Sequence, residues 1–125
     1  MDLIKKISIT AFFILFNILL LSQEDPYKPV ADEMPEPVGG YEAIYKIIEY
    51  PDIAKKAGVQ GKVYLLAYIN EKGGVDDVKV VKGLGAGCDE AAIDAVKKQK
   101  FNPGKVQGQA VKVKLTIPII FKLKF

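Results

Sequence analysis

The chain has 125 residues and a formal net charge of +3, and all 18 of its basic residues are lysine. Without arginine, the chain lacks the bidentate clamps that recognise phosphate or guanine. Histidine is also absent, which removes the commonest general base and the usual zinc ligand. We therefore expect one small domain that is not an enzyme, uses no cofactor or metal and binds no nucleic acid.

The first 22 residues have the parts of an export signal. Lys5 and Lys6 give a positive start, and Ile7–Leu21 is a largely apolar run of 15 residues. That length fits the apolar region of a signal peptide and falls short of the roughly 20 residues of a comfortable membrane span. Two interpretations are left open, a signal peptide cleaved near Ser22 and a short inner-membrane anchor. In both, we expect the rest of the chain in the periplasm.

Residues 23–38 are acidic and contain four prolines. Such a segment is too polar and too rich in proline to pack, and it is typical of a semi-extended linker. We expect the folded domain to occupy residues 39–125.

Two short helices are predicted between Gly40 and Gly58. The first has apolar residues spaced as one helical face, namely Tyr41, Ile44, Tyr45 and Ile48. Pro51 suits the first turn of the second helix, where its missing N–H costs nothing, and Gly58 can end that helix in a left-handed cap. The residues that the second helix should bury are Ile53, Ala54 and Ala57.

A β-hairpin is predicted next, with strands at residues 62–70 and Val75–Lys82. The first strand is apolar on both faces, which favours a central position in a sheet. The turn lies around Glu71–Gly74, where Gly73 and Gly74 are expected to supply positive φ angles.

The stretch that begins at Cys88 gives the clearest helix prediction, with acids first and lysines last. The sequence FNPG ends it, and its apolar side is formed by Cys88, Ala91, Ala92, Ala95 and Val96. A single cysteine cannot form an intramolecular disulfide. We interpret Cys88 as a small buried apolar residue, with intermolecular pairing or redox sensing as the alternatives.

The last 15 residues, Val111–Phe125, have an apolar residue at every odd position. This alternation predicts a strand with one buried face. Proline is tolerated only at a sheet edge or a break, so Pro118 places the strand at the edge and is expected to end its regular pairing. The lysines at even positions protect an exposed edge. The expected sheet order is return strand, central strand, last strand, with helices on one face.

An exposed edge in an exported protein suits strand addition, in which a partner's extended segment pairs with the main chain. The alternative from the residues alone is that the edge has no binding role. Tyr64 and Tyr68 could stack on a ligand, but packing across the strands explains them more simply.

Several motifs occur in order within residues 39–123. They are Tyr50-Pro51 with Ala54, Gly61-Lys62-Val63, Gly73-Gly74, Asp89-Glu90-Ala91-Ala92, Phe101 with Pro103-Gly104, and Ile117-Pro118-Ile119 followed by Phe121. In type and spacing, this set resembles the C-terminal domain of the TonB energy-transducer family, in the short form with the lead-in MPEPVGG.

The resemblance implies an α+β two-layer sandwich, with two or three helices on one face of a three-stranded antiparallel sheet. It implies a periplasmic domain that binds a short peptide of an outer-membrane TonB-dependent receptor along the last strand, in energy-dependent transport. Inner-membrane motor proteins are further implied partners. The implied contacts are Val111, Lys112, Val113, Lys114, Leu115, Thr116 and Ile117, with Asp52–Lys56, chiefly Asp52, Lys55 and Lys56, as a second group.

Two features differ from the family pattern. Ile7–Leu21 carries no histidine to couple to a motor, and Gln23–Pro37 reaches at most about 50 Å when extended. The resemblance therefore implies receptor binding more directly than force transduction. A structural envelope module that forms a homodimer through the same edge is the alternative.

Overall fold

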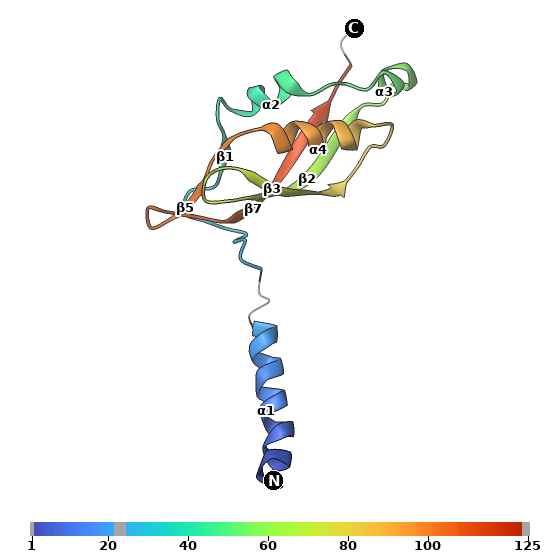
Figure 1. The fold of residues 1–125 in the computed structure, drawn as a ribbon. Helices are drawn as coiled ribbons and strands as arrows, with labels where there is room; N and C mark the ends of the chain where they lie inside the picture. Colours follow the sequence, from blue (N-terminus) through green and yellow to red (C-terminus); the bar gives the residue numbers. More distant parts are fainter. Residues whose placement is uncertain (1, 22–24, 124–125) are drawn as a thin grey trace.

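The structure is a computed structural model that describes residues 2–21 and 25–123 (Figure 1). Its elements are α1 (Asp2–Leu21), β1 (Glu36–Pro37), α2 (Tyr41–Ile47), α3 (Asp52–Ala57), β2 (Gly61–Ile69), β3 (Val75–Lys82), α4 (Cys88–Lys98), β4 (Phe101–Asn102), β5 (Gly104–Val106), β6 (Gln109–Val111) and β7 (Val113–Phe121). Within the described residues, no helix combines the length and apolar character needed to cross a membrane.

The main sheet has the strand order β3-β2-β7, and both pairings are antiparallel. β2 lies in the centre because both of its faces are apolar, and β7 lies at an edge. Two small strand pairs, β1 with β4 and β5 with β6, accompany this sheet. The predicted sheet order and the predicted α+β two-layer fold are confirmed.

The core lies between α4 and one face of the sheet, across which α4 runs in Figure 1. From α4, Cys88, Ala92, Ala95 and Val96 are buried, and from β2 every second residue, Val63, Leu65, Ala67 and Ile69, is buried. Small side chains on α4 let its backbone approach the sheet closely. The buried position of Cys88 confirms its interpretation as a small apolar residue.

The turn between β2 and β3 depends on one glycine and one asparagine. Gly73 has a φ of 82°, whereas Gly74 is not in the positive-φ region, so the prediction for Gly74 is wrong. Instead, the Asn70 side chain accepts hydrogen bonds from the N–H groups of Lys72 and Gly74, at 2.9 and 3.0 Å. These two hydrogen bonds from the main chain to the Asn70 side chain stabilise the turn, so that a second residue with a positive φ angle is not needed.

The second helix buries less than the spacing predicts. Ala54 is fully buried, but Ile53 is 72% exposed and Ala57 is also exposed. A helix of six residues makes less than two turns, and Ile53 points about 100° away from Ala54 around the axis. The predicted left-handed cap at Gly58 is confirmed by a φ of 69°.

The C-terminal segment is not one continuous strand, so that prediction is wrong. Lys112 separates β6, which pairs with β5, from β7, and β7 ends at Phe121. Residues 124 and 125 lie outside the described residues. Pro118 does not end the pairing either, because it pairs with Tyr64 and the register continues to Phe121 opposite Gly61.

The segment before the domain packs against it, contrary to the prediction for a linker. Lys28 bridges to Val113, Glu33 bridges to Lys105, and β1 pairs with β4. Pro35 and Pro37 are buried. Strand pairing satisfies main-chain groups of this segment, so its polar composition did not prevent packing.

We predict that Gly73→Ala destabilises the domain far more than Gly108→Ala. Both glycines have positive φ angles, which cost an L-residue about 1–2 kcal/mol, but a Cβ at Gly73 would lie 1.8 Å from the carbonyl oxygen of Phe101, whereas one at Gly108 meets nothing within 4 Å. The free energy of unfolding in urea should therefore fall by about 1–3 kcal/mol more for Gly73→Ala than for Gly108→Ala. Equal losses for the two variants would contradict this account of the turn.

Candidate strand-binding edge

The outer edge of β7 is defined by the direction of its main-chain groups. The N–H of Lys114 donates to the carbonyl oxygen of Lys28 at 3.0 Å, and the N–H of Ile120 donates to the hydroxyl of Tyr45 at 3.2 Å. Both contacts lie on the side away from β2. Because main-chain groups alternate along a strand, all even-numbered residues of β7 present their N–H and C=O groups outward. Pro118 is one of them, so its missing donor falls outside the β2 ladder.

Between these two contacts the edge is open. Lys114 C=O, both main-chain groups of Thr116 and Pro118 C=O have no hydrogen-bond partner among residues 2–21 and 25–123. At about 3.3 Å per residue, this window is about 13 Å long. It offers one donor and three acceptors to an added strand.

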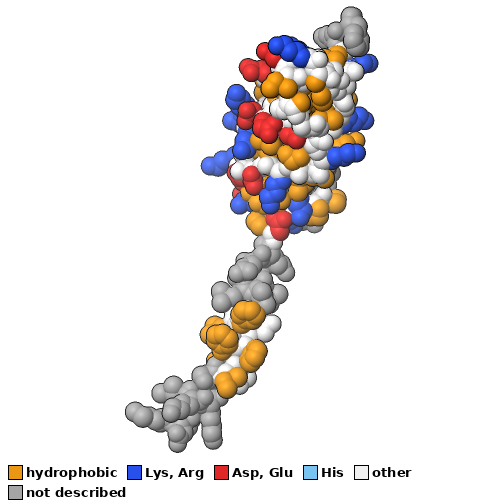
Figure 2. Space-filling model, turned by 90° about the vertical axis from the view of Figure 1, so that its right-hand side faces the viewer, with side chains coloured by type: hydrophobic (Ala, Val, Ile, Leu, Met, Phe, Trp, Pro, Cys, Tyr) orange, Lys and Arg blue, Asp and Glu red, His pale blue; other side chains and the backbone are white. Residues whose placement is uncertain are grey.

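The side chains beside the edge are those that alternation predicts. Val113, Ile117, Ile119 and Phe121 are buried, whereas the even-numbered residues lie on the open face of the sheet. Figure 2 shows lysine side chains at both margins of the domain, with acidic side chains and apolar patches between them. Lys114 at the start of β7 and Lys122 just after its end add charge beside the strand, which protects an exposed edge against indiscriminate pairing.

The segment Asp25–Lys28 contacts the start of this edge. The Tyr27 hydroxyl donates a hydrogen bond to Asp76, which raises the pKa of Tyr27 to about 12. The same bond lowers the pKa of Asp76, with a further contribution from the amide of Asn70 at 2.8 Å. The pKa of Asp25 is lowered first by the N–H of Tyr27 and then by Lys114, whose Nζ lies 3.0 Å from Asp25 Oδ2.

The second predicted group, Asp52, Lys55 and Lys56, lies on α3 at the other end of β7. The Tyr50 ring, which precedes α3, stands edge-on to Phe121 at 5.4 Å between centroids, and Lys55 Nζ lies 6.0 Å from the Tyr50 centroid. Val113–Ile117 forms the opposite end of the strand, where Val113 pairs with Ile69, whereas Val111 lies in β6, opposite Gly104 of β5. The structure therefore does not bring the two predicted groups together.

The sequence interpretation missed both residues that bound the open window. Tyr45 was assigned only to a helical face, yet it is 40% exposed and its hydroxyl reaches Ile120. Lys28 lies in a segment for which no packing was predicted. Nothing in the spacing of the sequence points to either contact.

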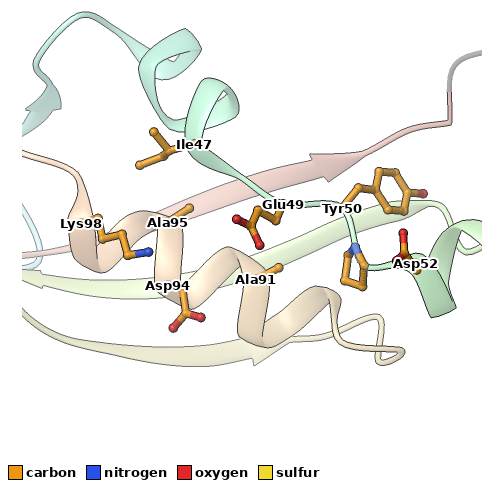
Figure 3. Close-up of a pocket in the computed structure, with 9 residues that line it drawn as sticks. Ile47, Glu49, Tyr50, Asp52, Ala91, Asp94, Ala95 and Lys98 are labelled. Carbon is orange, nitrogen blue, oxygen red and sulfur yellow. The ribbon is translucent and has the colours of Figure 1, made fainter.

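A separate open groove of about 450 Å³ lies between α4 and the connection from α2 to α3 (Figure 3). Glu49, Tyr50 and Asp52 line one side, and Asp94 and Lys98 of α4 line the other. Within the part of the chain that the structure describes, no three His, Cys, Asp or Glu residues are placed to hold a metal ion. Cys88 is fully buried, and burial raises the pKa of its thiol, which disfavours the thiolate form.

The sheet order, the helix across one face and the open edge strand define a small α+β domain of the type found at the C-termini of TonB proteins. Residues 47–123 match the family model described as "Gram-negative bacterial TonB protein C-terminal". The chain belongs to this family.

Relatives and solved structures agree with this assignment. "Protein TonB" of Xanthomonas campestris pv. campestris (strain B100) is 40% identical over 76 residues, which are 60% of this chain and 34% of that protein. "Protein TonB" of Vibrio cholerae is 33% identical over 76 residues, 60% of this chain and 31% of that protein. The solution structure of Helicobacter pylori TonB-CTD (residues 194–285) superposes with a TM-score of 0.54 at 34% identity, covering 67% of this chain and 89% of that one. The chain thus matches only about a third of the length of these full-length relatives.

We predict that the contact of Asp25–Lys28 with β7 is constant from about pH 5 to 9 and weakens outside that range. Asp25 and Asp76 have lowered pKa values, so their contribution is complete above the ordinary value of about 3.9 and is lost as pH falls through the lowered pKa. Tyr27 has a pKa raised to about 12, so its contribution is complete below the ordinary value of about 10 and is lost as pH rises towards 12.

The NMR signals of the Tyr27 ring report this contact, and Asp76→Ala supplies the reference for its loss. The chain contains no histidine. A transition of the Tyr27 ring signals near neutral pH would therefore contradict the assignment.

Proposed function

We propose that this domain binds an extended segment of an outer-membrane TonB-dependent receptor by strand addition along β7, in energy-dependent transport across the outer membrane. The observation that carries the proposal is the window of outward main-chain groups from Lys114 to Pro118, which has no partner among the described residues. An added strand would pair with these main-chain groups and extend the sheet beyond β7.

The window sets what a guest strand must offer. Its N–H groups would donate to the carbonyl oxygens of Lys114, Thr116 and Pro118, and one of its carbonyl groups would accept from the Thr116 N–H. Since Pro118 has no donor, the pairing beyond Thr116 depends on donors from the guest. Lys112 and Lys114 beside the window favour a guest with acidic side chains by charge complementarity.

Family membership supports the transport role. The relatives named above are TonB proteins, and the periplasmic position that we propose would bring the edge within reach of outer-membrane partners. Residues 1–22, as a cleaved signal or as an inner-membrane anchor, would provide export. Coupling to inner-membrane motor proteins is part of the proposal, as is the assignment of Val111–Ile117 and Asp52–Lys56 as contact residues.

We predict that Thr116→Pro abolishes binding of a receptor peptide while the fold is retained. The substitution removes the one outward donor of the window and leaves the β2 ladder intact, because that ladder uses the odd-numbered residues. Thr116→Val keeps the donor and is the matched control, with affinity within about threefold of the unaltered chain, since a surface change of this kind is within about 0.5 kcal/mol.

Titration of the labelled protein with the peptide, followed by the amide signals of β7, measures both affinities. Binding that is unaffected by Thr116→Pro would refute strand addition at this edge. If sedimentation shows instead that the unaltered chain is a dimer and Thr116→Pro a monomer, the edge serves the self-associating module rather than a receptor.

A further inference from the structure

The part of the edge next to the open window is already occupied by the chain itself. Lys28 forms a parallel bridge with Val113. The Lys28 N–H donates to the carbonyl oxygen of Lys112 at 2.9 Å, and the Lys28 carbonyl accepts from the N–H of Lys114 at 3.0 Å. These are outward main-chain groups of the same kind as those in the window. A guest paired along the whole of Val111–Ile117 would need them.

Side chains fix the position of this segment more specifically than its main-chain bonds do. The Tyr27 ring stands edge-on to the ring of Tyr68 on β2, with centroids 5.0 Å apart. Lys112 Nζ lies 5.5 Å from the centroid of the Tyr27 ring. The Tyr27 hydroxyl donates a hydrogen bond to Asp76 on β3. Tyr68, Asp76 and Lys112 together form what we call the tyrosine socket.

A second contact lies two residues earlier. Asp25 accepts the N–H of Tyr27 at 2.9 Å and forms an ion pair with Lys114 at 3.0 Å. Asn70, from the turn between β2 and β3, donates to Asp76 at 2.8 Å and so holds the acceptor of the socket in place. The socket is therefore built by the folded domain, from β2, β3 and the connection between β6 and β7, and not by the N-terminal segment.

The contact is suited to exchange. Its ion pair is solvent-exposed, since the side chains of Lys114 and Asp25 are 31% and 43% exposed. Exposed ion pairs contribute little, and ordering a short segment has a considerable entropic cost. Such a segment can leave its position without disturbing the core.

We propose that the tyrosine socket and Lys114 form a recognition site for an extended segment with a carboxylate two residues before a tyrosine, and that the chain's own Asp25–Lys28 fills this site in competition with a guest strand. This second proposal rests on the proposed function, because it assumes that guest strands pair with the edge of β7. A guest would bind first in the open window and extend to Lys112 only by displacing Asp25–Lys28. The guest that does so best has an acid and a tyrosine at the same spacing.

The first test uses amide hydrogen exchange in the full chain. The N–H groups of Lys114 and Thr116 both point outward on β7, but only Lys114 is paired with Lys28. We expect the Lys114 amide to be protected relative to Thr116 in the unaltered chain and to lose that protection in Tyr27→Ala. Tyr41→Ala is the matched control, because Tyr41 is a partly exposed tyrosine of α2 without contacts to the socket among those described above. Equal exchange at Lys114 and Thr116 in the unaltered chain would overturn the inference.

The second test supplies the segment in trans. An acetylated peptide with the sequence DPYKPV, residues 25–30, should bind Tyr27→Ala at least about tenfold more tightly than the unaltered chain, whose tethered segment has an effective concentration in the millimolar range. The same peptide with alanine in place of tyrosine should bind neither. Equal affinity of DPYKPV for the two proteins would show that Asp25–Lys28 does not compete for the site.

The two proposals can fail separately. If DPYKPV binds Tyr27→Ala as expected but no receptor peptide binds any variant, the socket and its internal occupant stand and the proposed transport role fails. If receptor peptides bind the unaltered chain and Tyr27→Ala with the same affinity, strand addition stands and the competition by Asp25–Lys28 is refuted.

Discussion

The alternation of main-chain direction along β7 is the constraint on which the rest of the structure depends. Odd-numbered residues of β7 direct their main-chain groups to β2 and their side chains to the core, while even-numbered residues turn both their main-chain groups and their side chains away from it. A single strand can therefore complete the sheet on one side and remain available on the other. Pro118 fits this division, because its missing N–H lies on the side where the sheet has no further strand of its own.

Two neighbours limit how much of the edge is available. Lys28 pairs with the start of β7, and Tyr45 supplies a hydroxyl to Ile120 near its end. What remains is a short window rather than a long bare strand, and short, lysine-flanked edges are less prone to indiscriminate pairing. A limited window also means that few main-chain bonds can form with a guest, so the side chains around it gain importance for specificity. The tyrosine socket is such a set of side chains.

Much of the fold could be predicted because its signals are local. The helix from Cys88, the central position of β2 and the edge position of β7 follow from spacing and from a single proline. The errors arise where contacts between distant residues prevail. Ile53 is exposed because α3 is too short to bury two faces. β7 is shorter than the alternating run Val111–Phe125, because the partner strand changes from β5 to β2 at Lys112.

The sequence by itself determined the order of the strands, the two-layer arrangement and the family to which the chain belongs, since these depend on periodicities of two and 3.6 residues and on motifs that can be read in order. Only the tertiary structure decided which main-chain groups of β7 are free. The contacts of Tyr45 with Ile120 and of Asp25 with Lys114 join residues 75 and 89 positions apart. No local pattern encodes such pairs, because they form only after the sheet and its flanking segments have been assembled.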